Sequence, residues 1–317
     1  MNILVTGAAG QIGSELTGVL RERYGNQNVV ATDINREAGE KIKNSGPFEL
    51  GDCTNYDQMK KIIQNYGIDT IYHLAAILSA VAENNTQLAW NVNMNGLYVM
   101  MELAREYKCS VFTPSSIGAF GPTTPKEHTP QDTVQRPTSM YGVTKVSGEL
   151  LCDYYYLKYQ VDTRGLRYPG IISNVTLPGG GTTDYAVEIY YEAIQKKQYT
   201  CFLKKDTYLD MMYMPDAIHG AITLMETDTQ KLKHRNAFNV SAMSFSPEEI
   251  YLEIKKRIPD FKIDYKVDPI RQSIADSWPR SMDDSAARNE WGWNPVYDLG
   301  KMTDDMIRVL KERYNAQ

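Results

Sequence analysis

Short apolar runs alternate with amphipathic segments along the first half of the chain. The apolar runs have the length and composition of buried parallel strands, and they lie at residues 2–6, 28–32, 47–50, 69–73, 110–113 and 161–167. Segments with helical periodicity separate most of them, at about residues 11–24, 55–66, 83–107 and 141–159. This alternation predicts an α/β fold, a Rossmann-type doubly wound parallel sheet.

The pattern changes after about residue 172. Strand-like pieces and helices then follow at residues 199–203, 208–213, 216–226, 247–257 and 298–313. We expect a first domain over residues 1–172, with 237–240 rejoining its sheet. The remainder, residues 173–317, is expected to form mainly a smaller substrate-binding lobe.

Composition and charge narrow the possible partners. The 317 residues carry a formal net charge of −5 and no basic stripe, which argues against nucleic acid or an anionic membrane as a partner. No apolar run reaches the ~18 residues of a membrane helix, and Met1 leads directly into an apolar strand. The four cysteines are far apart, and no histidine clusters with them. We therefore expect reduced thiols, no metal site and a cytoplasmic protein.

The first strand–helix junction is rich in glycine. Gly7, Gly10 and Gly13 are spaced three residues apart between the predicted strand and helix. This spacing is a variant of the dinucleotide-binding pattern, in which backbone N–H groups approach a pyrophosphate. The start of the helix, at Gln11 and Ile12, adds favourable partial charge for the same anion. A glycine-rich turn without a ligand is the alternative, but the position directly after the first strand favours a nucleotide site.

An acidic residue ends the second strand. Asp33 follows Gly13 by twenty residues, where a carboxylate accepts hydrogen bonds from the adenosine ribose and repels a 2′-phosphate. We therefore predict NAD rather than NADP as the cofactor, and interpret the nearby Arg36 as a solvated surface charge. Asp52 and Cys53, after the third strand, are candidate adenine contacts, although Asp52 is an equally good candidate for a helix N-cap.

Small residues follow the fourth strand. Leu74, Ala75 and Ala76 come directly after it and allow a flat cofactor to lie against the backbone. We interpret His73, at the end of that strand, as a packed histidine rather than a catalyst. Ser79 is expected in the loop beyond and is a candidate substrate contact.

The candidate chemistry lies in the helix predicted at residues 141–159. Tyr141 and Lys145 are four residues apart, so their side chains share one helix face. A phenol normally ionises near pH ~10, and a neighbouring cation favours the phenolate. Such a tyrosine can remove a proton from an alcohol while hydride leaves the same carbon. Ser115 and Ser116 follow the fifth strand, and one of the two hydroxyls is expected to orient the alcohol while the other caps the backbone.

Together these features resemble the extended short-chain dehydrogenase/reductase family. The resemblance rests on the glycine pattern, Asp33, Ser115-Ser116, Tyr141-x-x-x-Lys145 and the late segment 291–295. The family places its active serine where Ser116 stands, with Ser115 as the neighbour that the motif does not exclude. It implies that a segment starting at Arg167 contacts the nicotinamide through its backbone, and the matching residues are Tyr168, Pro169 and Ile171.

Within that family the chain is similar to the short-chain L-threonine 3-dehydrogenases, over residues 118–125, 166–173, 181–188, 211–217 and 278–281. The resemblance implies NAD-dependent oxidation of the β-hydroxyl of L-threonine to 2-amino-3-oxobutyrate. In it Tyr141 is the base, Lys145 holds the nicotinamide ribose, and Ser116 or Ser115 orients the hydroxyl. It also implies a glycine-rich lid from residue 178 and substrate contacts from Gly181, Thr182, Thr183 and Asp184. Trp278 is a candidate to close the substrate side, and simple packing is its alternative role. Asp184 pairs with the substrate ammonium in this interpretation, or else caps the following helix.

The resemblance also implies a homodimer. The helices around residues 88–107 and 141–159 carry apolar positions, among them Leu150, Leu151, Tyr154 and Tyr155. The family pairs such helices in a four-helix interface. The alternative is that these side chains pack on the sheet of their own chain.

Two other functions share these motifs. A nucleotide-sugar epimerase or dehydratase of the same fold uses the same Tyr, Lys and Ser but must hold a diphosphate, for which Arg271 and Arg280 are candidates. An NAD-sensing regulator is the other alternative, and the complete set of Tyr141, Lys145 and Ser116 argues against it, because a sensor has no need for all three.

Overall fold

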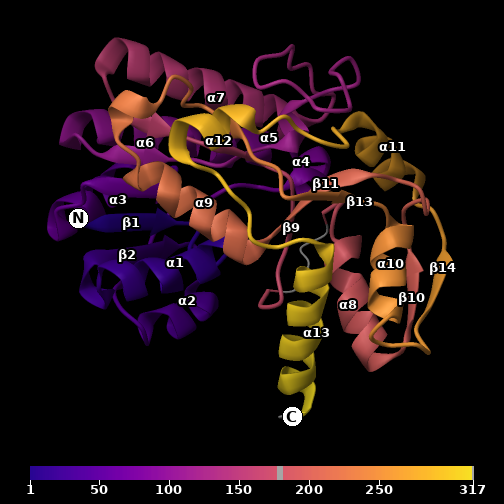
Figure 1. Ribbon diagram of the computed structural model, residues 1–317. Coiled ribbons are helices and arrows are strands. Elements are labelled where there is room, and N and C mark those ends of the chain that lie inside the picture. Colours follow the sequence, from indigo (N-terminus) through magenta and orange to yellow (C-terminus); the bar gives the residue numbers. More distant parts are fainter. Residues whose placement is uncertain (177–180, 316–317) are drawn as a thin grey trace. The chain divides into compact units, whose positions relative to one another are not determined.

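The computed structural model describes residues 1–176 and 181–315, which form two compact units (Figure 1). One unit comprises Met1–Ala119, Ser139–Arg167 and Ile218–Phe238. The other comprises Phe120–Thr138, Tyr168–Ala217 and Asn239–Gln317. The chain therefore passes between the units several times.

The first unit is built on a six-stranded sheet with the order β3-β2-β1-β4-β5-β7. All neighbouring strands are parallel, and the order reverses direction between β1 and β4, as in a doubly wound fold. The predicted fold class is confirmed. The strands are β1 (Ile3–Thr6), β2 (Val29–Asp33), β3 (Phe48–Leu50), β4 (Thr70–His73), β5 (Ser110–Phe112) and β7 (Thr163–Arg164).

Helices cover both faces of this sheet (Figure 1). Apolar side chains of β1, β4 and β5 pack against α3, α6 and α7 in one buried cluster, which includes Leu4, Ile71, Val111, Met59 and Met100. Burial of these side chains is the main stabilising contribution to the unit. Its helices are α1 (Gln11–Tyr24), α2 (Arg36–Lys43), α3 (Tyr56–Tyr66), α4 (Ser79–Asn84), α5 (Thr86–Trp90), α6 (Gly96–Tyr107) and α7 (Met140–Tyr159), with a π-helical turn at Asn91–Asn95 and short 3₁₀ helices at Asn26–Asn28, Ile117–Ala119 and Thr229–Lys231.

Two predicted elements were wrong in their extent. The helix expected at 83–107 is divided into α4, α5, the π-helical turn and α6, and Ser79 is the buried first residue of α4 rather than a loop residue. The strand expected at 161–167 is divided at Gly165 into β7 and β8 (Leu166–Tyr168). Gly165 donates its N–H to Arg235 O at 2.9 Å and accepts from Phe238 N at 2.9 Å. The incoming segment, residues 235–238, thus takes both backbone hydrogen bonds of Gly165, so β7 and β8 do not continue as one strand.

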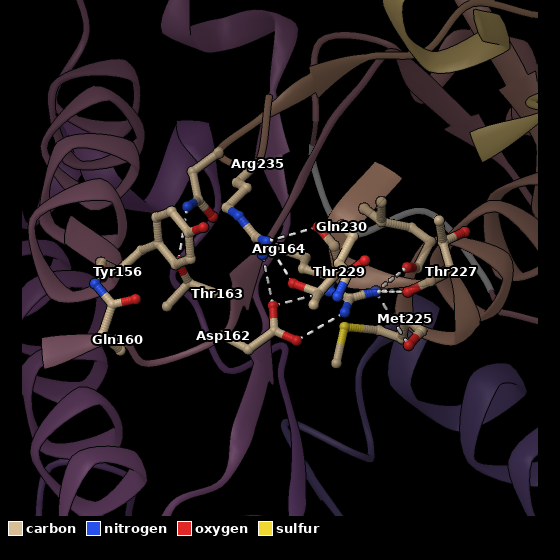
Figure 2. Close-up of polar contacts among 12 residues, drawn as sticks. Tyr156, Gln160, Asp162, Thr163, Arg164, Met225, Thr227, Thr229, Gln230 and Arg235 are labelled. Atoms are coloured by element: carbon tan, nitrogen blue, oxygen red, sulfur yellow. Dashed lines mark hydrogen bonds and ion pairs between the residues drawn. The ribbon is translucent and has the colours of Figure 1, made fainter. Parts of the chain in front are cut away.

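An ionic network of two buried arginines and the half-buried Asp162 fixes that incoming segment (Figure 2). Asp162 accepts hydrogen bonds from Arg164 and Arg235, each at 2.7 Å. Arg164 also donates to the carbonyls of Leu224 and Thr227 at 2.6 Å, near the end of α9 (Met214–Glu226). The Arg235 guanidinium lies 3.9 Å from the centre of the Tyr156 ring. Arg164 and Arg235 thus share the single carboxylate of Asp162. The carbonyls at the end of α9 and the face of the Tyr156 ring compensate the second positive charge.

The second unit contains two small sheets, with orders β13-β11-β9 and β10-β14. A separate short sheet has the order β12-β8-β6, and β6 belongs to the first unit. The sequence pattern predicted β10, β11, α8, α9, α10 and α13 but not β9, β13, β14, α11 or α12. The remaining elements are β6 (Ser115–Ser116), β9 (Gly170–Ile172), α8 (Tyr185–Gln195), β10 (Gln198–Cys201), β11 (Leu209–Tyr213), β12 (Phe238–Asn239), β13 (Met243–Phe245), α10 (Pro247–Lys255), β14 (Lys262–Tyr265), α11 (Pro269–Ser277), α12 (Ser285–Trp291) and α13 (Leu299–Asn315).

One carboxyl group is fully buried in the second unit. Asp210, in β11, accepts hydrogen bonds from Ser241 Oγ at 2.8 Å and from Met282 N at 2.9 Å. Burial raises the pKa of Asp210 well above its ordinary value, because loss of hydration outweighs these two bonds. The folded state therefore holds this proton at a pH where the unfolded chain has released it, so Asp210 destabilises the fold as pH rises above the unfolded value of ~3.9.

We predict that Asp210→Asn raises the thermal midpoint, and by more at pH 8 than at pH 5. The neutral amide can donate to Ser241 Oγ and accept from Met282 N, so both contacts survive without an ionisable group. Each pH unit within the affected range changes the relative stability by at most about 1.4 kcal/mol. Thermal unfolding of both proteins at the two pH values tests this. A variant that is less stable than the wild type at both pH values would contradict it.

Candidate active site

The glycine-rich turn after β1 packs directly on the segment after β4. Gly7 has φ of +68°, and a Cβ built on it would lie 2.6 Å from Ala75 N and 2.8 Å from Ala75 Cα. Gly10 donates its N–H to Gly7 O at 3.0 Å, which closes the turn. The backbone of the small residues after β4 therefore packs directly against the backbone of the glycine-rich turn. This contact lies at the carboxyl end of the sheet, where parallel sheets bind ligands.

Gly13 lies in the first turn of α1 and faces the same loop. A Cβ on Gly13 would collide with Gly7 O and lie 2.9 Å from Ala8 Cα. Gln11 and Ile12 begin the helix, whose first N–H groups have no partners within the helix. A backbone turn this tight, ending in free helical N–H groups, has the form of a pyrophosphate cradle.

Asp33 is the last residue of β2 and holds the same turn in place. Its carboxylate accepts hydrogen bonds from Ala9 N and from Asn35 N, both at 2.9 Å. The half-buried side chain thus stands beside the glycine loop at the position predicted for a ribose contact. Arg36 is exposed at the start of α2, in agreement with its interpretation as a surface charge.

The two residues expected near the adenine differ in exposure. Asp52 is exposed and accepts hydrogen bonds from Thr54 N and Oγ1 at 2.8 Å, whereas the N-cap of α3 is Asn55. The alternative role of Asp52 as that N-cap was therefore wrong. Cys53 is buried, and burial raises the pKa of its thiol to about 12. The thiol is therefore uncharged at neutral pH.

Helix α7 presents Tyr141 and Lys145 on one face. The helix begins after Ser139, whose side chain accepts from Gly142 N at 3.1 Å. Lys145 Nζ lies 5.4 Å from the centre of the Tyr141 ring and donates to Pro114 O at 2.7 Å. The ammonium is therefore fixed between the phenol and the segment that follows β5.

The structure distinguishes the two serines. Ser115 is buried, and its hydroxyl donates to the Glu149 carboxylate. Ser116 is half-buried, and its Oγ accepts from Gly118 N at 3.1 Å. A Cβ on Gly118 would lie 3.1 Å from the Tyr141 ring and 3.4 Å from Ser116 Oγ. The Ser116 hydroxyl and the Tyr141 ring thus flank the same glycine, whereas the Ser115 hydroxyl is directed to Glu149.

A cavity of about 30 Å³ lies beside Lys145 and is large enough for a water molecule. His73 borders it and lies 2.8 Å from Thr6 Oγ1 through Nδ1. Burial, together with the Lys145 charge, lowers the pKa of His73 to about 3, so the ring is neutral at physiological pH. Asn93, also at the cavity, bonds both backbone groups of Ile77. Other lining residues include Ala75, Ala76, Pro114, Ser115, Glu149 and Asn236.

The other predicted contacts belong to the second unit. Tyr168 is buried and donates its hydroxyl to Ala217 O at 2.7 Å, and Pro169 and Ile171 follow it at β9. Trp278 is buried at the end of α11. These residues are positioned by their own unit, and their roles toward a ligand stay predictions.

The predicted lid is described only from Gly181. Residues 178–180 of that stretch lie outside the described residues. Thr182 is buried and Thr183 half-buried. Asp184 precedes α8, but its carboxylate accepts from Gly181 N at 2.5 Å and makes no cap bond to the helix. The alternative that Asp184 caps the helix through its side chain was therefore wrong.

Sequence reasoning missed Glu149 and its ion pair with Arg167 in this region. Glu149 is four residues after Lys145 on the same helix face, which was the available signal. Across residues 1–176 and 181–315, no group of three or more metal-ligating side chains occurs, and the four cysteines are free and buried. No helix within the described chain is long and apolar enough to cross a membrane.

Comparison with known proteins identifies the family. The model of the NAD dependent epimerase/dehydratase family matches residues 3–241. The chain belongs to this family. An epimerase/dehydratase of Staphylococcus haemolyticus, itself described as uncharacterized, is 58% identical over 311 residues, which cover 98% of each chain.

Two solved structures are also similar to this epimerase/dehydratase family member. The L-threonine dehydrogenase of Clostridium difficile is 59% identical, with a TM-score of 0.97 and coverage of 98% of each chain. A monomeric L-threonine 3-dehydrogenase from a metagenome is 46% identical, with a TM-score of 0.94 and coverage of 98% of this chain and 99% of that one. The family assignment implies a nicotinamide dinucleotide cofactor, which the glycine cradle fits.

We predict that Gly13→Ala abolishes dinucleotide binding while leaving the sheet folded. The added methyl group would collide with the backbone of Gly7 and Ala8, so the cradle has to deform. Gly18→Ala is the matched control in the same helix, because no atom lies within 4 Å of its Cβ, and it should be neutral or stabilising by up to ~1 kcal/mol. Calorimetric titration with NADH and circular dichroism test both. Wild-type affinity in Gly13→Ala would contradict the assignment.

Proposed function

We propose that the protein oxidises the β-hydroxyl of L-threonine with NAD⁺, giving 2-amino-3-oxobutyrate and NADH. The observation that carries the proposal is the arrangement at Gly118, where the Tyr141 ring and Ser116 Oγ flank one glycine and Lys145 lies 5.4 Å from that ring. A base, a hydroxyl and a cation are the groups that alcohol oxidation by hydride transfer requires. The similarity to two L-threonine dehydrogenase structures supports the choice of substrate.

In this mechanism Tyr141 removes the proton from the β-hydroxyl. The Lys145 ammonium lies 5.4 Å from the centre of the Tyr141 ring, and its bond to Pro114 O keeps it in place. Ser116 donates to the substrate oxygen and so orients it. Ser115 does not take this role, because its hydroxyl is engaged by Glu149.

Residues of the first unit are proposed to hold most of the cofactor. Gly7, Gly10 and Gly13 would receive the pyrophosphate, and Asp33 the adenosine ribose. NAD⁺, when bound, supplies the hydride acceptor. The Asp33 carboxylate would repel a 2′-phosphate, so we propose NAD rather than NADP. The other proposed contacts are Gln11, Ile12, Asp52, Cys53, Leu74, Ala75, Ala76, Tyr141, Lys145, Tyr168, Pro169 and Ile171.

The amino acid is proposed to bind through hydroxyls and one carboxylate. Thr182 and Thr183 offer hydroxyls, and Asp184 offers a carboxylate for the substrate ammonium. The bond from Gly181 N holds one oxygen of Asp184, Oδ2, which fixes the orientation of that carboxylate. Ser79 and Trp278 are proposed to complete the contacts, Ser79 from the start of α4.

A nucleotide-sugar epimerase or dehydratase remains the second candidate, because the family includes both activities. Its substrate diphosphate would need arginines such as Arg271 and Arg280. The Arg271 guanidinium lies 4.2 Å from the centre of the Phe202 ring, and Arg280 pairs with Glu127 at 3.3 Å. Both groups thus have partners within the protein, which favours the amino-acid substrate.

We also propose a homodimer that forms through α6 and α7. Leu150, Leu157 and Tyr98 expose 64%, 73% and 52% of their surface on these helices, and Tyr154 is exposed beside them. Tyr155, by contrast, is buried in the core of the unit, and Leu151 is partly buried against that core. The apolar positions therefore divide between the core and an outer face, and a second copy of the chain would cover the outer face.

The four free, buried cysteines support a reducing compartment, and we propose the cytoplasm as the place of action. Their thiols need no disulfide partner in this fold. The same compartment would supply NAD⁺ to the proposed reaction.

We predict that Tyr141→Phe lowers L-threonine turnover by about 10²- to 10⁴-fold, because the base is removed. NADH affinity and thermal midpoint should stay close to wild type. Tyr66→Phe is the matched control, since it removes a hydroxyl bound to Glu49 at 2.7 Å, at the end of α3. The measurement is NADH absorbance with L-threonine and NAD⁺, with NADP⁺ and a UDP-sugar as parallel arms. Wild-type turnover in Tyr141→Phe would refute the assigned base, and turnover of the UDP-sugar alone would favour the second candidate.

We predict that Leu150→Glu combined with Leu157→Glu converts a dimer into a monomer, because two charges then lie on the proposed interface. Light scattering after size exclusion measures the mass. Leu252→Glu, at a 49% exposed position on α10, is the control and should leave the mass unchanged. A wild-type protein that is already monomeric, like the metagenome relative, would contradict the dimer.

A further inference from the structure

Helix α7 carries a third ionisable side chain, a carboxylate, on the face of Tyr141 and Lys145. Glu149 follows Lys145 by one more step of four residues, and it is 6% exposed. Its carboxylate accepts from Arg167 Nη2 at 2.9 Å and from Arg167 Nε at 3.1 Å. Arg167 is likewise 6% exposed, so this is a buried, two-point ion pair.

The carboxylate also binds the segment that carries the proposed active serine. Ser115 Oγ donates to Glu149 Oε1, and the preceding carbonyl, Pro114 O, accepts from Lys145 Nζ at 2.7 Å. Adjacent residues of one short segment are thus held by two neighbouring side chains of α7. Ser116 is the next residue, and its Oγ is fixed by Gly118 N at 3.1 Å.

We propose that Glu149 is a positioning residue, which sets the location of the Ser116 hydroxyl by holding Ser115. The inference rests on the proposed function for its catalytic readout. Arg167, from β8, sets the orientation of the carboxylate, and the carboxylate fixes the Ser115 side chain. Successive residues of a strand point to opposite faces, so a fixed Ser115 leaves the Ser116 side chain directed to the other side, toward Gly118 and Tyr141.

A buried ion pair is weak evidence for stability as such. Replacing both partners with apolar residues of similar volume often leaves a fold unharmed, because the cost of burying two charges disappears with them. A paired replacement can therefore separate the fold from the positioning role. It keeps the packing between α7 and β8 but removes the acceptor that Ser115 uses.

The experiment compares Glu149→Met combined with Arg167→Met, and separately Ser115→Ala, with the wild type. Both variants should fold and bind NADH with wild-type affinity. We expect kcat for L-threonine to fall about 10- to 100-fold, the loss typical of a misplaced catalytic group, with an unchanged KM for NAD⁺. In a Ser116→Ala background the paired Met replacement should cause no further loss. Amide exchange over residues 114–119 should rise in both variants, a readout that does not depend on the substrate.

Asp162→Asn is the control for breaking a buried ionic contact elsewhere in the same unit. It disturbs the network of Arg164 and Arg235 (Figure 2), and it should lower the thermal midpoint without changing kcat or exchange at 114–119. Wild-type kcat in the folded Met pair would overturn the proposal, as would unchanged exchange over 114–119. A wild-type enzyme without activity on L-threonine would instead contradict the proposed function, and the exchange measurement would still decide the role of Glu149.

Discussion

The contact between helix α7 and the segment after β5 is the interaction on which the candidate site depends. Lys145 holds Pro114 O, Glu149 holds Ser115, and Gly118 leaves room for the Tyr141 ring. The bonds of Lys145 and Glu149 join residues 31 and 34 positions apart in sequence. A side chain on Gly118 would displace the phenol or Ser116. The helix thereby converts a four-residue spacing into a fixed arrangement of a phenol, an ammonium group and a hydroxyl group.

A second constraint lies at the cofactor cradle. Gly7 and Gly13 are both closed to a Cβ by backbone atoms, so the turn between β1 and α1 tolerates nothing larger than glycine there. Asp33 secures the same turn by accepting from Ala9 N. The cradle and the α7 contact both lie in the unit built on the six-stranded sheet, at the carboxyl ends of its strands. The chemistry proposed here needs both, because the carbon that gives up the hydride carries the hydroxyl group that loses the proton.

Much of this arrangement could be predicted from local patterns, and the failures have physical causes. Apolar runs and glycine spacing located β1, β2, β4, β5 and α7 because those elements are buried and regular. The strand expected at 161–167 was divided, because Gly165 bonds to a segment about 70 residues later, which local periodicity does not report. Ser115 and Ser116 could not be distinguished from spacing alone, since Glu149 reaches Ser115 only after α7 has packed. The family resemblance, and not the pattern, supplied the substrate.

The most direct test of the account follows the hydrogen on the β-carbon of threonine. Wild-type protein would be incubated with NAD⁺ and L-threonine deuterated at that carbon, and the reduced cofactor analysed by mass spectrometry. The account predicts that deuterium appears in the NADH in a one-to-one ratio with the ketone formed. Deuterium that stays on the amino acid, with NAD⁺ unreduced, would contradict the central claim that this chain is an L-threonine-oxidising member of its family.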